Sequence, residues 1–273
     1  MSSAVLCLSC APQPERALSC PQARPRGYSV SVSTLTFPPQ QILGLSPETV
    51  DYQRAWDLQQ TLHHSVVQGE RPGAVLFLEH SPVYTAGRRT EPQDLPDDGS
   101  EVVAVDRGGK LTWHGPGQLV CYPVVRLAHP AEVRDYVWFL EEVVIRTLAD
   151  VGLQAVRVDG RSGVWLLAGA GRPQDEKIAA VGLRVTQGVS MHGFALNCSN
   201  PLAPFEHIVA CGVSDAGTTT ISRELGRTLT PAQVLPSVRE HFTQMQAHYL
   251  AAVSALTYDR TATDNALLEG SSL

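Results

Sequence analysis

Cys211 and Lys177 are the two side chains whose types and surroundings best suit nucleophilic chemistry. Gly212 follows the cysteine directly and leaves space beside its sulfur. Lys177 begins an alternating apolar segment, and the only other lysine in the chain is Lys110. A thiol beside a lysine ammonium has a lowered pKa and is a better nucleophile. Each residue alone also fits a plainer interpretation: a buried, inert cysteine and a solvated lysine at the start of a strand.

A glycine-rich segment, RGGKLTWHGPGQ (107–118), raises the question of a phosphate site. Its spacing does not match the P-loop, in which the glycine loop ends in Lys-Ser or Lys-Thr and opens a helix. No helix N-terminus follows it to hold a pyrophosphate, so a dinucleotide site is also unsupported. A hairpin rich in turn residues is the plain alternative. A plain turn, however, requires neither Trp113 nor His114.

Composition narrows the class of protein. The chain has 273 residues, 43% of them hydrophobic, and a formal net charge of −6. This acidic balance disfavours nucleic acid as a partner, and no apolar run approaches the roughly 18 residues of a membrane helix. The six cysteines do not form a disulfide framework, so reduced thiols in a cytosolic compartment fit better. Cys7 and Cys10 lack the second pair that a structural zinc site requires, so no metal is expected.

The elements expected from periodicity and capping signals are three helices and several strands. They are a helix from Ser46-Pro47-Glu48 to about Gly69, a helix from Pro130 to Gly152, a helix from Thr230-Pro231 to about Leu250, and strands at 73–80, 101–106, 118–125, 154–158, 163–167, 177–185 and 191–197. Strands clustered between helices indicate an α/β or α+β domain. We expect one catalytic domain at 29–255, between a disordered extension at 1–28 and a disordered tail at 256–273. The extension also fits a transit peptide or a misassigned start.

Four motifs in this order resemble the octanoyl-[acyl-carrier-protein]–protein N-octanoyltransferases, the lipoate–protein ligase B type of the biotin/lipoate ligase-like superfamily. They are RGGKLTWHGPGQLVCYP (107–123), KIAAVGLRV (177–185), MHGFALN (191–197) and Cys211-Gly212. The resemblance extends over roughly residues 30 to 250. Ala210 departs from the family, which often has proline before the cysteine, and Trp113 stands where tyrosine is frequent.

The resemblance implies a mixed β-sheet with flanking helices and the first step of endogenous protein lipoylation. An octanoyl or lipoyl group would pass from acyl carrier protein, through a thioester on Cys211, to a specific lysine of lipoyl domains. The acceptors implied are the lipoyl domains of 2-oxoacid dehydrogenase complexes and the glycine cleavage H protein. No cofactor or metal is implied, and the location would be cytoplasmic, or the mitochondrial matrix in a eukaryote.

The resemblance also assigns roles to residues. Cys211 would carry the acyl group and Lys177 would lower the pKa of its thiol. The residues implied to line the acyl site are Arg107, Gly108, Gly109, Lys110, Leu111, Thr112, Trp113, His114, Ala180, Val181, Gly182, Gly193, Phe194 and Ala195. Arg88, Arg89, Arg107 and Arg184 are the candidates for a patch that receives acidic protein partners.

Thioester chemistry agrees with this set of residues. Exchange between two thioesters is nearly neutral in energy, so no ATP is required, in keeping with the missing phosphate loop. A neutral Lys177 would suit the removal of a proton from an attacking amine, which arginine does not do. Two alternatives stay open: an ATP-dependent lipoate or biotin ligase on the same fold, and a non-catalytic module that binds a carrier protein.

Overall fold

The computed structural model describes residues 38–169, 171–208 and 215–250, all of them in one compact unit. The predicted extension (1–28) and tail (256–273) lie outside the described residues, and so does Cys211. Among the described residues, no helix is long and apolar enough to cross a membrane.

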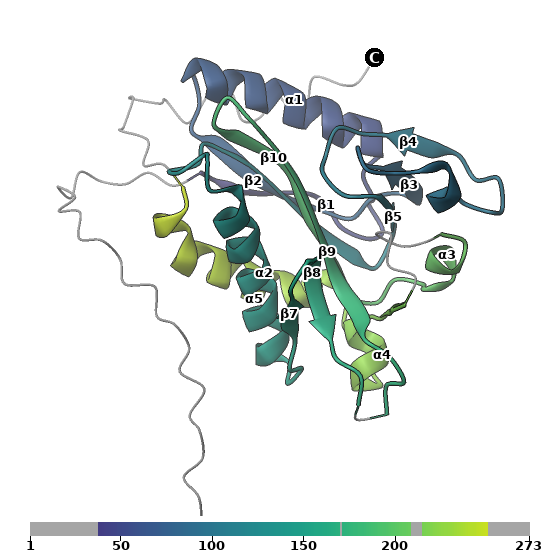
Figure 1. The fold of residues 1–273 in the computed structure, drawn as a ribbon. Coiled ribbons are helices and arrows are strands. Elements are labelled where there is room, and N and C mark those ends of the chain that lie inside the picture. The colour runs from purple at the N-terminus through teal and green to yellow at the C-terminus, as the bar shows by residue number, and fades with distance from the viewer. Residues whose placement is uncertain (1–37, 170, 209–214, 251–273) are drawn as a thin grey trace, which may run out of the picture. The chain divides into compact units, whose positions relative to one another are not determined.

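The main sheet has eight strands within the described residues (Figure 1). They are β1 (Gln40–Gly44), β2 (Gly73–Leu78), β6 (Gln118–Val125), β10 (Val189–Asn197), β9 (Glu176–Thr186), β8 (Arg161–Leu166), β7 (Val156–Val158) and β11 (Gly217–Thr218). The first seven follow one another in this spatial order, and β11 pairs with β9. The pairs β1·β2 and β11·β9 are parallel and the others are antiparallel. The predicted mixed sheet is confirmed.

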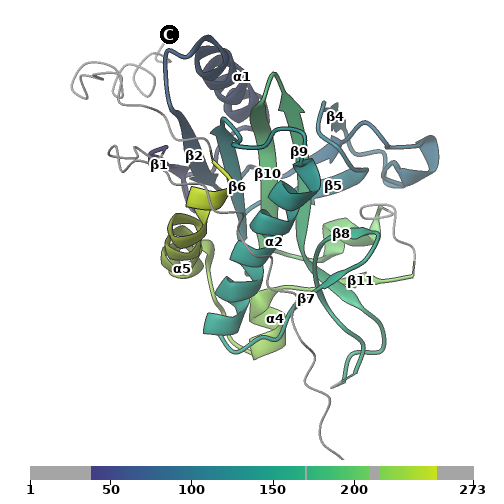
Figure 2. The ribbon, with the colours of Figure 1, turned by 60° about the vertical axis from the view of Figure 1, so that its left-hand side comes forward.

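Helices cover both faces of this sheet (Figures 1 and 2). α1 (Tyr52–Gln68) packs on one face, and α2 (Val133–Asp150) and α5 (Pro231–Met245) pack on the other. Successive side chains of β2 point to opposite faces of the sheet. Val75 and Phe77 join the core under α2 and α5, and Leu76 and Leu78 join the core under α1. A strand buried on both faces is uniformly apolar, as GAVLFL is.

A second sheet of three strands lies beside the first (Figure 1). It consists of β4 (Val102–Ala104), β3 (Val83–Ala86) and β5 (Leu111–His114), in the order β4-β3-β5. β3 pairs antiparallel with β5, and Val83 lies opposite His114. The smaller elements are η1 (Pro92–Asp94), α3 (Ala203–Glu206), α4 (Ile221–Leu225) and η3 (Gln246–His248). β5 therefore presents the middle of the glycine-rich segment (107–118) as a strand.

The predicted start of the first helix is wrong. α1 begins at Tyr52, and Asp51 is its N-cap, whose carboxylate accepts from the backbone N–H of Arg54 at 2.9 Å. Ser46 is not available as a cap, because its hydroxyl donates to the carboxylate of Glu79 at 2.7 Å. Ser46 and Asp51 are both residues that favour an N-cap, and in the structure it is Asp51 that caps the helix.

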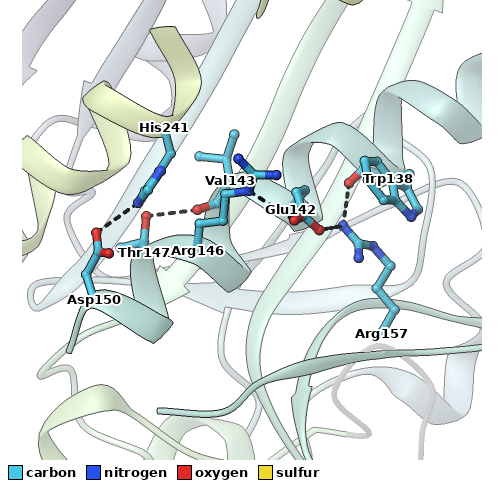
Figure 3. Close-up of polar contacts among 8 residues, drawn as sticks. All are labelled: Trp138, Glu142, Val143, Arg146, Thr147, Asp150, Arg157 and His241. Atoms are coloured by element: carbon cyan, nitrogen blue, oxygen red, sulfur yellow. Dashed lines mark hydrogen bonds and ion pairs between the residues drawn. The ribbon is translucent and has the colours of Figure 1, made fainter. Parts of the chain in front are cut away.

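Other helix ends differ less from the prediction. α2 begins at Val133 rather than at Pro130, since the preceding residues form a turn in which Glu132 N–H donates to His129 O at 3.0 Å. α5 ends at Met245 and continues as the turn η3. Figure 3 shows the contact that joins α2 to α5, in which Asp150 accepts from His241 at 2.8 Å. β1 and β3 were not predicted.

Candidate active site

A cavity of about 400 Å³ opens between β5, β9, β10 and α1. Most of the residues predicted to line an acyl site line this cavity: Arg107, Gly109, Lys110, Thr112, His114, Ala180, Val181, Gly182, Gly193, Phe194 and Ala195. Lys177 lines it as well. Segments that lie about 70 residues apart in the sequence, the glycine-rich segment and the β9–β10 hairpin, thus meet at one site.

Three predicted residues do not line the cavity. Leu111 and Trp113 are buried behind it, and Gly108 is absent from its wall. The Trp113 ring packs edge-on against Phe205, with centroids 5.7 Å apart. The indole at this position is therefore buried and packed against α3.

Cys211 belongs to the segment 209–214, outside the described residues. Asp215, four residues further along, lines the cavity, and its carboxylate pairs with Arg161 at 2.6 Å. The next strand, β11, pairs with the start of β9, where Thr218 lies opposite Lys177.

The two cysteines that the structure does describe, Cys121 and Cys198, are not suited to catalysis. Both are fully buried in the core. Burial raises the pKa of the Cys121 thiol well above its usual value, and burial raises the pKa of Cys198 too. Neither thiol would form a useful fraction of thiolate near neutral pH.

Arg107 holds the glycine-rich segment in shape. Its guanidinium donates to the carbonyl of Thr85 at 2.8 Å, to the hydroxyl of Thr85 at 2.9 Å and to the carbonyl of Lys110 at 2.8 Å. The side chain is buried, so Arg107 is not part of an exposed docking patch, contrary to the sequence-based expectation. Arg184 is also engaged, in an ion pair with Asp106.

Glycines allow this segment to lie directly on β9. The N–H of Gly108 donates to the carbonyl of Leu183 at 2.8 Å. A Cβ on Gly182 would lie 3.1 Å from the carbonyl oxygen of Gly108, so a side chain there would push the two segments apart. Gly109 has φ of +89°, a conformation that favours glycine. The close approach predicted at Gly182 is therefore made by backbone.

Lys177 is the second residue of β9 and is 8% exposed. Its Nζ lies over the ring of Trp165, 4.6 Å from the centroid. Among the described residues, no carboxylate forms an ion pair with it. Gly163 lies beside it on β8, where a Cβ would be only 2.5 Å from the carbonyl oxygen of Ala179 on β9. The lysine is thus a desolvated cation at the cavity wall and not a solvated strand end.

His114 is fixed by a chain of hydrogen bonds. The side-chain nitrogen of Gln118 donates to the carbonyl of Trp113 at 3.2 Å and to Oδ1 of Asn197 at 2.9 Å. Nδ2 of Asn197 in turn donates to the carbonyl of Thr219 at 3.1 Å. Because Gln118 uses its donors in this way, its Oε1 faces Nδ1 of His114, 2.7 Å away, as an acceptor.

The tautomer of His114 follows from this chain. Nδ1 must carry the hydrogen, so Nε2 keeps its lone pair. Burial lowers the pKa of His114 well below its usual value, so the ring is neutral near pH 7. Since His114 lines the cavity, it both holds the segment and offers a hydrogen-bond acceptor beside it.

Sequence reasoning missed a buried polar cluster at one end of the cavity. Tyr52 and Tyr122 line it, and the hydroxyl of Tyr122 bonds to Nε2 of His80 at 2.8 Å. Burial lowers the pKa of His80 to about 4 and raises the pKa of Tyr52 to about 12. Tyr122 stands inside a quoted motif and could have been found; Tyr52 and His80 carry no local signal.

His192, which belongs to the motif MHGFALN (191–197), also lines the cavity. Its Nε2 bonds to Asp106 at 2.8 Å, and its backbone N–H donates to Gln59 of α1 at 2.8 Å. The backbone has φ of +59°, which turns the side chain toward Trp56 of α1. Burial lowers the pKa of His192, although Asp106 opposes this shift.

Comparison with known proteins defines the class. The model of the lipoyl protein ligase A/B catalytic domain matches residues 51–243, and the chain belongs to this family. An octanoyltransferase of Renibacterium salmoninarum is 55% identical over 208 residues, which cover 76% of this chain and 89% of that protein. One of Pseudarthrobacter chlorophenolicus is 56% identical over 213 residues, covering 78% and 94%. The predicted enzyme class, acyltransferase, is confirmed.

Solved structures agree on the fold. A bipartite lipoate protein ligase of Thermoplasma acidophilum aligns with a TM-score of 0.58 at 13% identity, covering 77% of this chain and 83% of that one. Lipoate-protein ligase A bound with ATP aligns with a TM-score of 0.53 at 12% identity, covering 77% and 85%. The predicted lipoate ligase-like fold is confirmed.

Proposed function

We propose that this enzyme transfers an octanoyl or lipoyl group from acyl carrier protein to a lysine of lipoyl domains. Cys211 carries the group as a thioester between the two transfers. The acceptors are the lipoyl domains of 2-oxoacid dehydrogenase complexes and the glycine cleavage H protein. The observation that carries the proposal is the desolvated Lys177 at the wall of a cavity formed by the predicted acyl-site residues, in a chain related to octanoyltransferases.

The first transfer exchanges one thioester for another. The Cys211 thiolate attacks the carbonyl carbon of the donor thioester, and the carrier's sulfur leaves and takes up a proton from Lys177, which becomes neutral. The ammonium of Lys177 stabilises the thiolate by charge proximity, and each tenfold gain in thiolate corresponds to about 1.4 kcal/mol. Asp215 lines the cavity four residues from Cys211, which brings the chain near Lys177 and supports this pairing.

The second transfer forms an amide. The amine of the acceptor lysine attacks the thioester on Cys211, the C–S bond breaks, and the thiolate of Cys211 is restored. A proton must leave the attacking nitrogen, and neutral Lys177 accepts it. The acyl chain lies along the wall of Ala180, Val181 and Phe194, where β9 and β10 offer small or apolar side chains.

Intact-mass measurement after mixing the enzyme with octanoyl carrier protein tests this proposal. We expect a gain of one octanoyl group in the wild type, its loss in Cys211→Ser, and its retention in the matched control Cys7→Ser. A wild type that stays unmodified would contradict the covalent route. Release of pyrophosphate dependent on ATP and lipoate would instead support the ligase alternative.

A further inference from the structure

The environment of Lys177 contains an unusual partner for its charge. The indole of Trp165 is 1% exposed, and the ammonium sits 4.6 Å from its centroid. Attraction between a cation and an aromatic face strengthens when water is excluded, and tryptophan is the best face for it. Trp165 therefore contacts Lys177 at a position where an ion-pairing carboxylate is more usual.

The indole is itself held in place. Trp165 lies opposite Lys177 in the pairing of β8 with β9, and its Nε1–H donates to the carbonyl of Arg161 at 2.9 Å. The ladder shifts by one residue between Val164 and Trp165. Held by its strand and by this hydrogen bond, the indole gives the ammonium one defined position.

The charged groups around this pair are already committed to other partners. Arg161 lies 5.8 Å from the same ring and is paired with Asp215 at 2.6 Å. Glu141, whose carboxylate interacts electrostatically with Lys177, accepts from Gly163 N–H at 2.8 Å and lies 3.3 Å from Arg157.

We propose that Trp165 is a positioning residue for Lys177, whose indole face fixes the ammonium without neutralising it. A carboxylate in its place would cancel the charge and hold the proton. The ring carries no net charge, so the field of the ammonium reaches a neighbouring thiolate, and the lysine remains able to lose and regain a proton. This inference rests on the proposed function, in which both properties are used.

The composition of the chain makes a direct test possible, because Lys110 and Lys177 are its only lysines. Protein labelled with ¹³C at the lysine Cε position gives two lysine signals, which Lys110→Arg assigns. We expect the Lys177 signal to lie upfield through the ring current of Trp165. In Trp165→Leu this displacement disappears, and in Trp165→Phe part of it remains.

Trp138→Leu is the matched control. The ring of Trp138, on α2, contacts an arginine and no lysine: Cζ of Arg157 lies 4.1 Å from its centroid (Figure 3). This substitution should leave the Lys177 signal unchanged. A wild-type Lys177 signal without upfield displacement, or leucine and phenylalanine variants with equal pH profiles of thiol alkylation, would overturn the proposal. If the proposal holds, the pH profile of alkylation of the Cys211 thiol shifts in Trp165→Leu and returns partly toward the wild-type profile in Trp165→Phe. Failure of the octanoyl mass test would instead count against the proposed function and leave the NMR result standing.

Discussion

At the scale of single residues, the two lysines of the chain occupy opposite electrostatic settings. Nζ of Lys110 lies 2.5 Å from Glu91 and 3.1 Å from Asp94, so its charge is neutralised locally. Lys177 is less exposed and lies against an aromatic ring. A chain that otherwise uses arginine thus keeps one lysine at a site where the loss of a proton would be useful.

Substituting Lys177→Arg separates the two tasks proposed for this lysine. Arginine keeps a positive charge, so the thiol at Cys211 should still react with iodoacetamide near neutral pH. Arginine does not accept the proton of the attacking amine, so transfer to a lipoyl domain should fall by about 100-fold or more. Alkylation and transfer are each followed by mass, and the melting temperature verifies folding. Near-normal transfer would show that another group accepts the proton.

At the scale of elements, the hydrogen bonds around Gln118 join strands of both sheets. Gln118 of β6 connects Trp113 and His114 of β5 to Asn197 of β10. The position of His114 at the cavity is therefore a property of three strands, and the tautomer of its ring depends on a side chain four residues away.

Gln118→Ala should destabilise the protein and release His114. Its loss leaves Nδ1–H of His114 and Oδ1 of Asn197 without partners, at about 1–3 kcal/mol for each buried group. Urea unfolding measures this loss, and ¹⁵N NMR of the His114 ring should show a mixture of tautomers. Gln53→Ala, on the exposed face of α1, is the matched control, with an expected change of about 0.5 kcal/mol or less. An unchanged His114 spectrum would show that the ring is fixed by packing alone.

Some of the elements and most of the cavity wall were predictable from the sequence. Apolar runs predicted β2, β6, β9 and β10, because a strand buried between two layers of helices needs apolar residues along its length. The motifs predicted most of the cavity wall. The start of α1 was missed because Ser46 and Asp51 are both good caps, and only Glu79, 33 residues away from Ser46, decides between them. Tyr52, His80 and Trp165 acquire their roles through contacts across strands and helices, which periodicity along the chain does not encode.

At the scale of the whole molecule, three buried histidines link stability to pH. Burial lowers the pKa of His80 to about 4, and burial also lowers the pKa values of His114 and His192. These rings are neutral in the folded protein, whereas in the unfolded chain they take up protons below about pH 6.5. Between about pH 6.5 and 4 the unfolded state binds more protons, so stability is complete above this window and is lost as the pH falls through it.

His80 alone should contribute about 3 kcal/mol of this loss, since its pKa moves from 6.5 to about 4 and each unit corresponds to about 1.4 kcal/mol. We expect the free energy of unfolding in urea to fall between pH 6.5 and 4, and the part of the fall above about pH 5 precedes the titration of most carboxylates. His80→Asn should reduce the slope by up to about 1.4 kcal/mol per pH unit, the effect of one proton. The variant also loses the hydrogen bond to Tyr122, which lowers its stability at every pH. The comparison therefore uses the slope of stability against pH and not the stability itself.

The matched control is His64→Asn, which removes an exposed histidine of α1 and should retain the wild-type slope. Direct titration of the His80 ring signal by NMR gives the folded-state value independently, even if the variant folds poorly. A midpoint near 6.5 for His80, or equal slopes in the wild type and His80→Asn, would contradict the neutral ring inferred here. A confirmed low midpoint would mean that the His80 ring, which is bonded to the cavity-lining Tyr122, stays uncharged near neutral pH, where the thiolate of Cys211 must form.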